Sequence, residues 1–258
     1  MLDWHGKEVE TAESAGRVIA LANALENVIR PGGIPWPPSE LVQKLYKSEQ
    51  VRAFHGPDEA IATKTLGFYS DLQSLHSEDA ITWSIFGPIA YAAPEIRVVF
   101  ARAFLELIDV PSESNSTANV WLWRRLPHPE KLVSDGPEID FGIQTDNVFL
   151  LGEAKWLSPV GRGQGIGRDE DQITLRRKFC EKYGPRLLPT CRRFVVLGLS
   201  LTGGIVPKTD DDVGGVALHM RDTTWQALTG LDSHPLAEEV RTYLSWKLSH
   251  SKLRTTQR

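Results

Sequence analysis

Residues 137–156 read PEIDFGIQTDNVFLLGEAKW, and this stretch decides the fold. Asp146 and Asn147 in its middle tolerate the positive φ angles that a two-residue hairpin turn requires. On either side, residues 138–144 and 148–156 have the pattern of β-strands. The stretch therefore predicts an antiparallel hairpin.

The predicted hairpin brings charged side chains to one of its faces. With the turn at Asp146 and Asn147, Asp140 lies directly opposite Glu153. Lys155 points the same way as Glu153, because successive side chains of a strand point to opposite faces. The other face, directed toward the core, carries Phe141, Ile143, Ala154 and Trp156.

These three charged residues are a candidate site. Two carboxylates directly opposite each other repel, and such a pair is normally destabilising. A divalent cation removes the repulsion, since carboxylate oxygens are the ligands that Mg²⁺ favours. Lys155 would reach a phosphate oxygen or an attacking water. Asp140, Glu153 and Lys155 therefore outline a site for metal-assisted phosphodiester hydrolysis.

A surface salt-bridge cluster is the alternative explanation for the same residues, and such clusters are common and contribute little stability. The apolar run Phe149-Leu150-Leu151 argues against it, because it indicates a strand in the centre of the sheet. Charged residues that emerge at the end of a buried strand favour the functional interpretation.

The rest of the chain is interpreted from apolar periodicity and from chain-breaking residues. We expect a helix that begins near Ser77, further helices over 8–29, 39–46, 95–108, 168–183 and 235–249, and strands over 119–126, 193–201 and 216–221, the last at a sheet edge. This order predicts an α/β (α+β) core, a mixed β-sheet flanked by helices.

Three segments are expected along the chain. Residues 1–76 form an N-terminal helical extension, residues 77–203 form the core, and residues 204–258 complete it with a strand and a helix and end in a basic tail. The proline- and glycine-rich stretch 30–39 separates the first helix from the next.

Asp140 and the triplet Glu153-Ala154-Lys155 resemble the signature of the PD-(D/E)XK nuclease superfamily, whose fold is the restriction-endonuclease-like fold. The resemblance covers residues 77–201, about half of the chain, and includes the order of the elements: a helix, the hairpin, a helix and a further strand. Pro137 precedes Asp140 by three positions, whereas the literal signature is a Pro-Asp dipeptide. The first acidic position varies widely within the superfamily.

The resemblance implies a role for each residue. Asp140, Glu153 and the backbone carbonyl of Ala154 would bind Mg²⁺ or Mn²⁺, and Lys155 would orient the nucleophilic water or stabilise charge on the phosphorane. Glu78, on the helix before the hairpin, is either a further metal ligand or a carboxylate that interacts with the helix dipole.

Other polar residues near the predicted site have two interpretations. Gln172 lies on the helix after the hairpin, and Arg176 follows one turn later on the same face; Gln172 is either part of the site or exposed to solvent. Arg176, like Arg162 and Arg168 in the glycine-rich loop 161–168, is a candidate contact to a nucleic-acid backbone. The alternative interpretation of this loop is a flexible connector without a contact to nucleic acid.

Composition sets the protein class. The chain has 258 residues, 41% of them hydrophobic and 24% charged, as in ordinary globular proteins. Its two cysteines exclude a disulfide scaffold. No apolar run reaches the roughly 18 residues that a membrane helix needs, and residues 1–10 lack a signal-type apolar stretch. We expect a cytoplasmic protein without a membrane partner.

The net charge is −4, yet residues 121–193 contain 13 Lys and Arg against 10 Asp and Glu. This local excess indicates either an anionic partner or ordinary solvated surface charge. We therefore expect a metal-dependent nuclease that acts on nucleic acid, with DNA as the expected polymer, in bacterial restriction or anti-phage defence. The alternative is a catalytically silent nucleic-acid-binding or scaffolding subunit of a larger complex. A homodimer or a protein partner is compatible with both.

Overall fold

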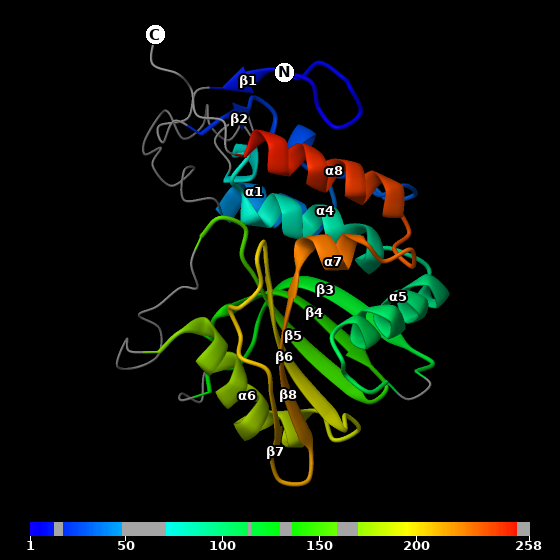
Figure 1. The fold of residues 1–258 in the computed structure, drawn as a ribbon, viewed down its shortest axis with the longest axis vertical. Helices are drawn as coiled ribbons and strands as arrows, with labels where there is room; N and C mark the ends of the chain where they lie inside the picture. The colour runs from blue at the N-terminus through cyan, green and yellow to red at the C-terminus, as the bar shows by residue number, and fades with distance from the viewer. Residues whose placement is uncertain (13–17, 48–70, 113–114, 130–135, 159–169, 252–258) are drawn as a thin grey trace. The chain divides into compact units, whose positions relative to one another are not determined.

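The computed structural model describes the chain except residues 13–17, 48–70, 113–114, 130–135, 159–169 and 252–258 (Figure 1). The chain divides into two compact units. One, here called the terminal unit, contains Met1–Pro88 and Glu238–Arg258; the other, the sheet unit, contains Ile89–Ala237. These boundaries differ from the expected ones at 76 and 203, because the end of the chain joins the terminal unit and residues 204–237 stay with the sheet.

The sheet unit is built on six strands in the order β3-β4-β5-β6-β8-β7. Their bounds are β3 Ala118–Arg125, β4 Glu138–Thr145, β5 Val148–Ala154, β6 Arg193–Ser200, β7 Thr209–Asp212 and β8 Ala217–Thr224. β5, β6 and β8 are parallel neighbours, and the other pairings are antiparallel. The predicted mixed sheet flanked by helices is thus confirmed.

Helices cover both faces of this sheet, with α5 (Pro94–Leu107) beside β3 and β4, and α6 (Gln172–Leu187) beside β5 and β6 (Figure 1). Every residue of β5 is buried, as expected for a central strand with parallel pairing. The expectation that only one hairpin face meets the core was therefore too simple. The face that carries the charged residues is also covered.

Local signals set the ends of these elements. Asp171 caps α6, since its side chain accepts a hydrogen bond of 2.7 Å from the Thr174 backbone N–H. Pro94 begins α5, where its missing N–H has no consequence.

The last strand differs from the prediction: β8 is internal, and β7 with its polar sequence TDDD forms the edge. A short helix that was not predicted, α7 (Trp225–Thr229), follows β8.

The terminal unit contains α1 (Ser39–Lys47) and α8 (Ala237–His250), together with α4 (Glu78–Ala90), whose last two residues belong to the sheet unit. These three helices agree with the prediction. As expected, Ser77 lies before α4 and accepts a hydrogen bond of 3.1 Å from the Ala80 N–H.

The predicted helix over residues 8–29 is wrong. The described part of this segment forms a two-residue pairing of β1 (Thr11–Ala12) with β2 (Ala20–Leu21), the 3₁₀ helix η1 (Ala24–Asn27) and loops; a second 3₁₀ helix, η2 (Asp71–Gln73), precedes α4. Partners distant in sequence explain the difference. The Asn27 side chain donates to the Leu72 and Ser74 carbonyls, and Gln73 donates to the Leu21 carbonyl at 3.0 Å. Non-local hydrogen bonds here override helical spacing.

Candidate functional site

The β4–β5 hairpin forms as predicted. Phe141 pairs with Gly152 and Gln144 with Phe149, which is the register that a two-residue turn at Asp146 and Asn147 requires. The Val148 N–H donates to the Thr145 hydroxyl at 3.1 Å and closes the turn. Asp140 and Glu153 directly follow the last hydrogen-bonded pair, at the end of the hairpin far from the turn.

Asp140 reaches across to the partner strand. The Ala154 backbone N–H donates to its Oδ2 at 2.8 Å. Its side chain is 17% exposed, so it remains the most accessible carboxylate of the predicted pair. In the register of β3 with β4, Trp123 falls between the pairs Leu122–Phe141 and Arg124–Ile139, and its φ of 52° is left-handed. Such a backbone costs a large side chain about 1–3 kcal/mol and is found where the surrounding structure enforces it.

Glu153 is fully buried between two cations. Its Oε1 lies 2.7 Å from Lys155 Nζ, and its Oε2 pairs with Arg176 Nη2. Burial, and next the nearby Asp140 carboxylate, raise the pKa of Glu153 to about 7, while Arg176 and Lys155 act in the opposite direction. The site therefore holds Glu153 in a position where its negative charge needs a counter-charge.

Lys155 is fixed by its backbone. Its N–H donates to the Leu199 carbonyl at 2.7 Å, and its carbonyl accepts a hydrogen bond of 2.9 Å from the Trp225 indole. These contacts come from β6 and α7, two elements that lie further along the chain than the hairpin. The ammonium group is thereby directed at Glu153 by a rigid strand end.

Arg176 joins this group from α6. Besides the pair with Glu153, its Nη2 lies 3.9 Å from Asp140 Oδ2 and donates to the Glu138 carbonyl at 3.1 Å. Arg176 is only 1% exposed. Its guanidinium lies against the carboxylates of the site, and its predicted contact with a nucleic-acid backbone stays a prediction.

The sequence contained a signal for the burial of Arg176. Ile173, Arg176 and Cys180 stand at positions i, i+3 and i+7 of α6, which is the spacing of a core-facing stripe. Both apolar members are buried against the sheet. An arginine within such a stripe needs a buried acidic partner, and Glu153 on the central strand is that partner.

The remaining predicted residues are placed as follows. Gln172 is the first residue of α6, half-buried, one turn before Arg176. Glu78 lies in the first turn of α4, in the terminal unit, next to Asp79, which pairs with Lys44 at 3.1 Å. Arg162 and Arg168 lie outside the described residues. The roles of Gln172 and Glu78 in the site stay predictions.

The site offers few protein atoms that could bind a metal ion. Among the residues that the structure describes, no group of three or more His, Cys, Asp or Glu side chains is arranged to hold a metal. An ion here would bind Asp140, Glu153 and the Ala154 carbonyl. Mg²⁺ fits such a set, because it commonly takes one or two carboxylates and keeps several waters. Both oxygens of Glu153 lie against cations in this structure, Oε1 against Lys155 and Oε2 against Arg176.

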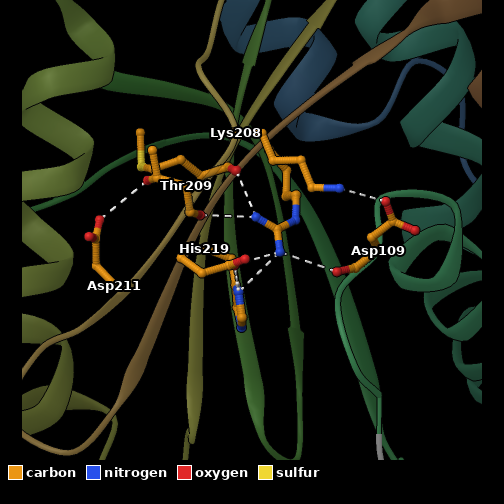
Figure 2. A network of polar contacts seen from close by, with 8 residues as sticks. Asp109, Lys208, Thr209, Asp211 and His219 are labelled. Carbon is orange, nitrogen blue, oxygen red and sulfur yellow. Dashed lines mark hydrogen bonds and ion pairs between the residues drawn. The ribbon is translucent and has the colours of Figure 1, made fainter.

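A second polar cluster surrounds Arg221 on β8 and was not predicted (Figure 2). Arg221 donates to the Thr209 carbonyl at 3.0 Å and the Asp109 carbonyl at 3.3 Å, and it pairs with Asp210 at 2.6 Å. His219 Nδ1 lies 2.5 Å from the same Asp210 oxygen. These contacts fasten the edge strand β7 and the end of α5 to β8, which is a structural role.

Comparison with known proteins adds no family. No family model matches the chain, and no curated protein is significantly similar to it. Within the described residues, no helix is both long and apolar enough to cross a membrane.

Proposed function

We propose that this protein is a metal-dependent nuclease of the restriction-endonuclease-like fold that hydrolyses phosphodiester bonds, with DNA as its substrate. The observation that carries the proposal is the convergence of Asp140, Glu153 and Lys155 at one end of a central hairpin. The mixed sheet with a helix on each face is compatible with that fold. By resemblance, the biological setting would be restriction or defence against foreign DNA in the bacterial cytoplasm.

Each residue has a task in the proposed reaction. Asp140, Glu153 and the Ala154 carbonyl would hold Mg²⁺ or Mn²⁺, which when bound activates water and screens the charge of the phosphate. Lys155 would orient the attacking water or stabilise the developing negative charge, since its ammonium group is held within the site by the strand end. Burial of Glu153 and Lys155 strengthens these electrostatic effects.

Cleavage assays on supercoiled, linear and single-stranded DNA and on RNA test the proposal. They are run with Mg²⁺, with Mn²⁺ and with EDTA, beside Asp140→Ala and Lys155→Ala. We expect metal-dependent products and a loss of about 10²-fold or more in both variants, as is typical when a proton-transfer or charge-stabilising group is removed. Lys208→Ala is the matched control, because Lys208 is 61% exposed and pairs with Asp109, away from the three proposed catalytic residues. Unchanged cleavage in Asp140→Ala and Lys155→Ala would refute the proposal.

A second candidate function is a catalytically silent nucleic-acid-binding or scaffolding subunit. It is favoured by the ion pairs of the site, in which two buried cations, Lys155 and Arg176, lie against the carboxylates. Binding of nucleic acid without any metal-dependent product on all four substrates would favour this function over the nuclease.

A further inference from the structure

Arg176 holds the position next to the carboxylates that a metal ion would need. Its Nη2 pairs with Glu153 Oε2 and lies 3.9 Å from Asp140 Oδ2, so one guanidinium nitrogen serves both carboxylates. Arg176 and Lys155 together balance the two negative charges. A divalent cation added to this arrangement would meet two positive charges in a buried site, where like charges repel strongly.

We infer that Arg176 is a built-in counter-cation that competes with the divalent metal for Glu153 and Asp140, so that metal binding requires the guanidinium to leave the carboxylates. This inference rests on the proposed metal site. Arg176 is thus a positioning residue: it offsets the negative charge of the carboxylates, and it raises the metal concentration at which the site fills.

The hydrogen bonding of Arg176 supports exchange over a permanent structural pair. A guanidinium has five N–H donors, and a stable buried ion pair satisfies them. Within the described residues, Nε and Nη1 of Arg176 are buried without a hydrogen-bond partner, so only Nη2 of the guanidinium contacts Glu153. The contact is electrostatic and poorly satisfied, so a better ligand can replace it.

The geometry explains why Arg176, and not Lys155, would compete with the metal for the carboxylates. It lies on the same strand end as Glu153, and its backbone is fastened to Leu199 and to the Trp225 indole. Arg176 instead reaches the carboxylates from α6 through a long side chain. Such a side chain can change rotamer without moving the sheet.

Calorimetric titration of the full chain with Mn²⁺ tests the competition. We expect Arg176→Met to bind Mn²⁺ about tenfold or more tightly than the unmodified protein, because a positive charge next to the ligands is removed. Arg177→Met is the matched control: Arg177 is the next residue, pairs with Glu181 and Asp211, and is 41% exposed. Its affinity should stay unchanged. Adding Glu153→Gln to Arg176→Met should abolish the binding.

A second measurement keeps the inference testable if Arg176→Met does not fold. The side-chain Nε–H resonance of Arg176, assigned with Arg176→Lys, is followed by NMR during titration of the unmodified protein with Mg²⁺. We expect this resonance to shift in proportion to metal occupancy, and to stay in place in Glu153→Gln. A purely structural Arg176 would keep the same rate of Nε–H exchange with water in the metal-bound protein, whereas a displaced guanidinium exchanges faster.

Each result decides the inference. Equal or weaker Mn²⁺ binding by Arg176→Met, no Mn²⁺ binding by any variant, or Mg²⁺ binding with a stationary Arg176 resonance would overturn it. Tighter Mn²⁺ binding by Arg176→Met without cleavage of any substrate would leave the competition standing and refute the nuclease. Metal-dependent cleavage together with an Mn²⁺ affinity that is unchanged in Arg176→Met would refute the competition and leave the nuclease standing.

Discussion

Each unit buries a cation, and the two cations have opposite surroundings. In the sheet unit, Arg176 lies against the carboxylates of Glu153 and Asp140. In the terminal unit, Lys247 is fully buried, and its Nζ donates to the Asn27 side-chain oxygen at 3.2 Å and to the Leu75 carbonyl at 3.0 Å. Both of these partners are neutral.

The difference teaches what a buried charge requires. Burial lowers the pKa of Lys247 to about 7, because no carboxylate of the described residues compensates for the lost water. Lys247 thereby approaches a neutral amine that serves as a hydrogen-bond donor within the core. The sheet unit instead keeps opposite charges side by side, which is an arrangement typical of sites that exchange ions or move protons.

The largest effect on stability is expected from Glu153→Leu. This change leaves Arg176 buried without its main partner, and breaking a buried pair in this way costs about 3–5 kcal/mol of unfolding free energy. Urea denaturation gives the value. The double variant Glu153→Leu with Arg176→Met should regain most of the loss, because no charge is left stranded. A double variant as unstable as the single one would show that Arg176 is not the stranded group.

A glycine next to the site should show a smaller effect. A Cβ at Gly152 would lie 2.2 Å from the Phe141 ring, so Gly152→Ala must displace a buried aromatic side chain. We expect a loss of about 1–3 kcal/mol, as is usual for overpacked cores. Gly32→Ala in the terminal unit is the control, since no heavy atom lies within 4 Å of the added Cβ, and it should change stability by less than about 0.5 kcal/mol. Equal losses in both variants would contradict the packing of the hairpin.

The smallest effect, per pH unit, is expected from the titration of Lys247. Its pKa is lower in the folded protein than in the unfolded chain, so between pH 10 and pH 7 only the unfolded chain takes up the proton. The free energy of unfolding should therefore decrease as the pH falls through this window, by at most about 1.4 kcal/mol per pH unit. Below pH 7 both states are protonated and the contribution is constant.

Urea denaturation between pH 7 and pH 10 measures this slope. Lys247→Met should reduce it, whereas Lys7→Met, at an exposed lysine of the same unit that pairs with Glu26, should keep it. A slope that is the same in Lys247→Met and in the unmodified protein would assign the titration to another group.

The sequence was sufficient for the β4–β5 hairpin and for the mixed character of the sheet, but not for its edge strand β7. The turn residues Asp146 and Asn147 set the register, and the register alone places Asp140 beside the end of the strand that carries Glu153. Local signals of this kind, a turn and a two-residue period, act within about twenty residues. The mixed sheet and its helices could be predicted for the same reason.

What the sequence did not reveal depends on contacts between distant segments. The helix expected over 8–29 is replaced by loops whose side chains bond to residues 72–75. The ion pair of Arg176 was not predicted because its partner Glu153 lies on another element, and the pairing is visible only when α6 lies on the sheet. Spacing along one element cannot identify such a partner.

The division of the chain also orders its folding during synthesis. The sheet unit is one continuous segment, Ile89–Ala237, whereas the terminal unit needs both Met1–Pro88 and Glu238–Arg258. Tyr243 donates to the Asn27 carbonyl at 2.9 Å, a contact that joins a residue made before the sheet unit to a residue made after it. At about 5–20 residues per second on the ribosome, the sheet unit emerges whole while the first segment still waits for α8. Chaperones that bind exposed apolar segments would therefore have access to Met1–Pro88 for longer than to Ile89–Ala237.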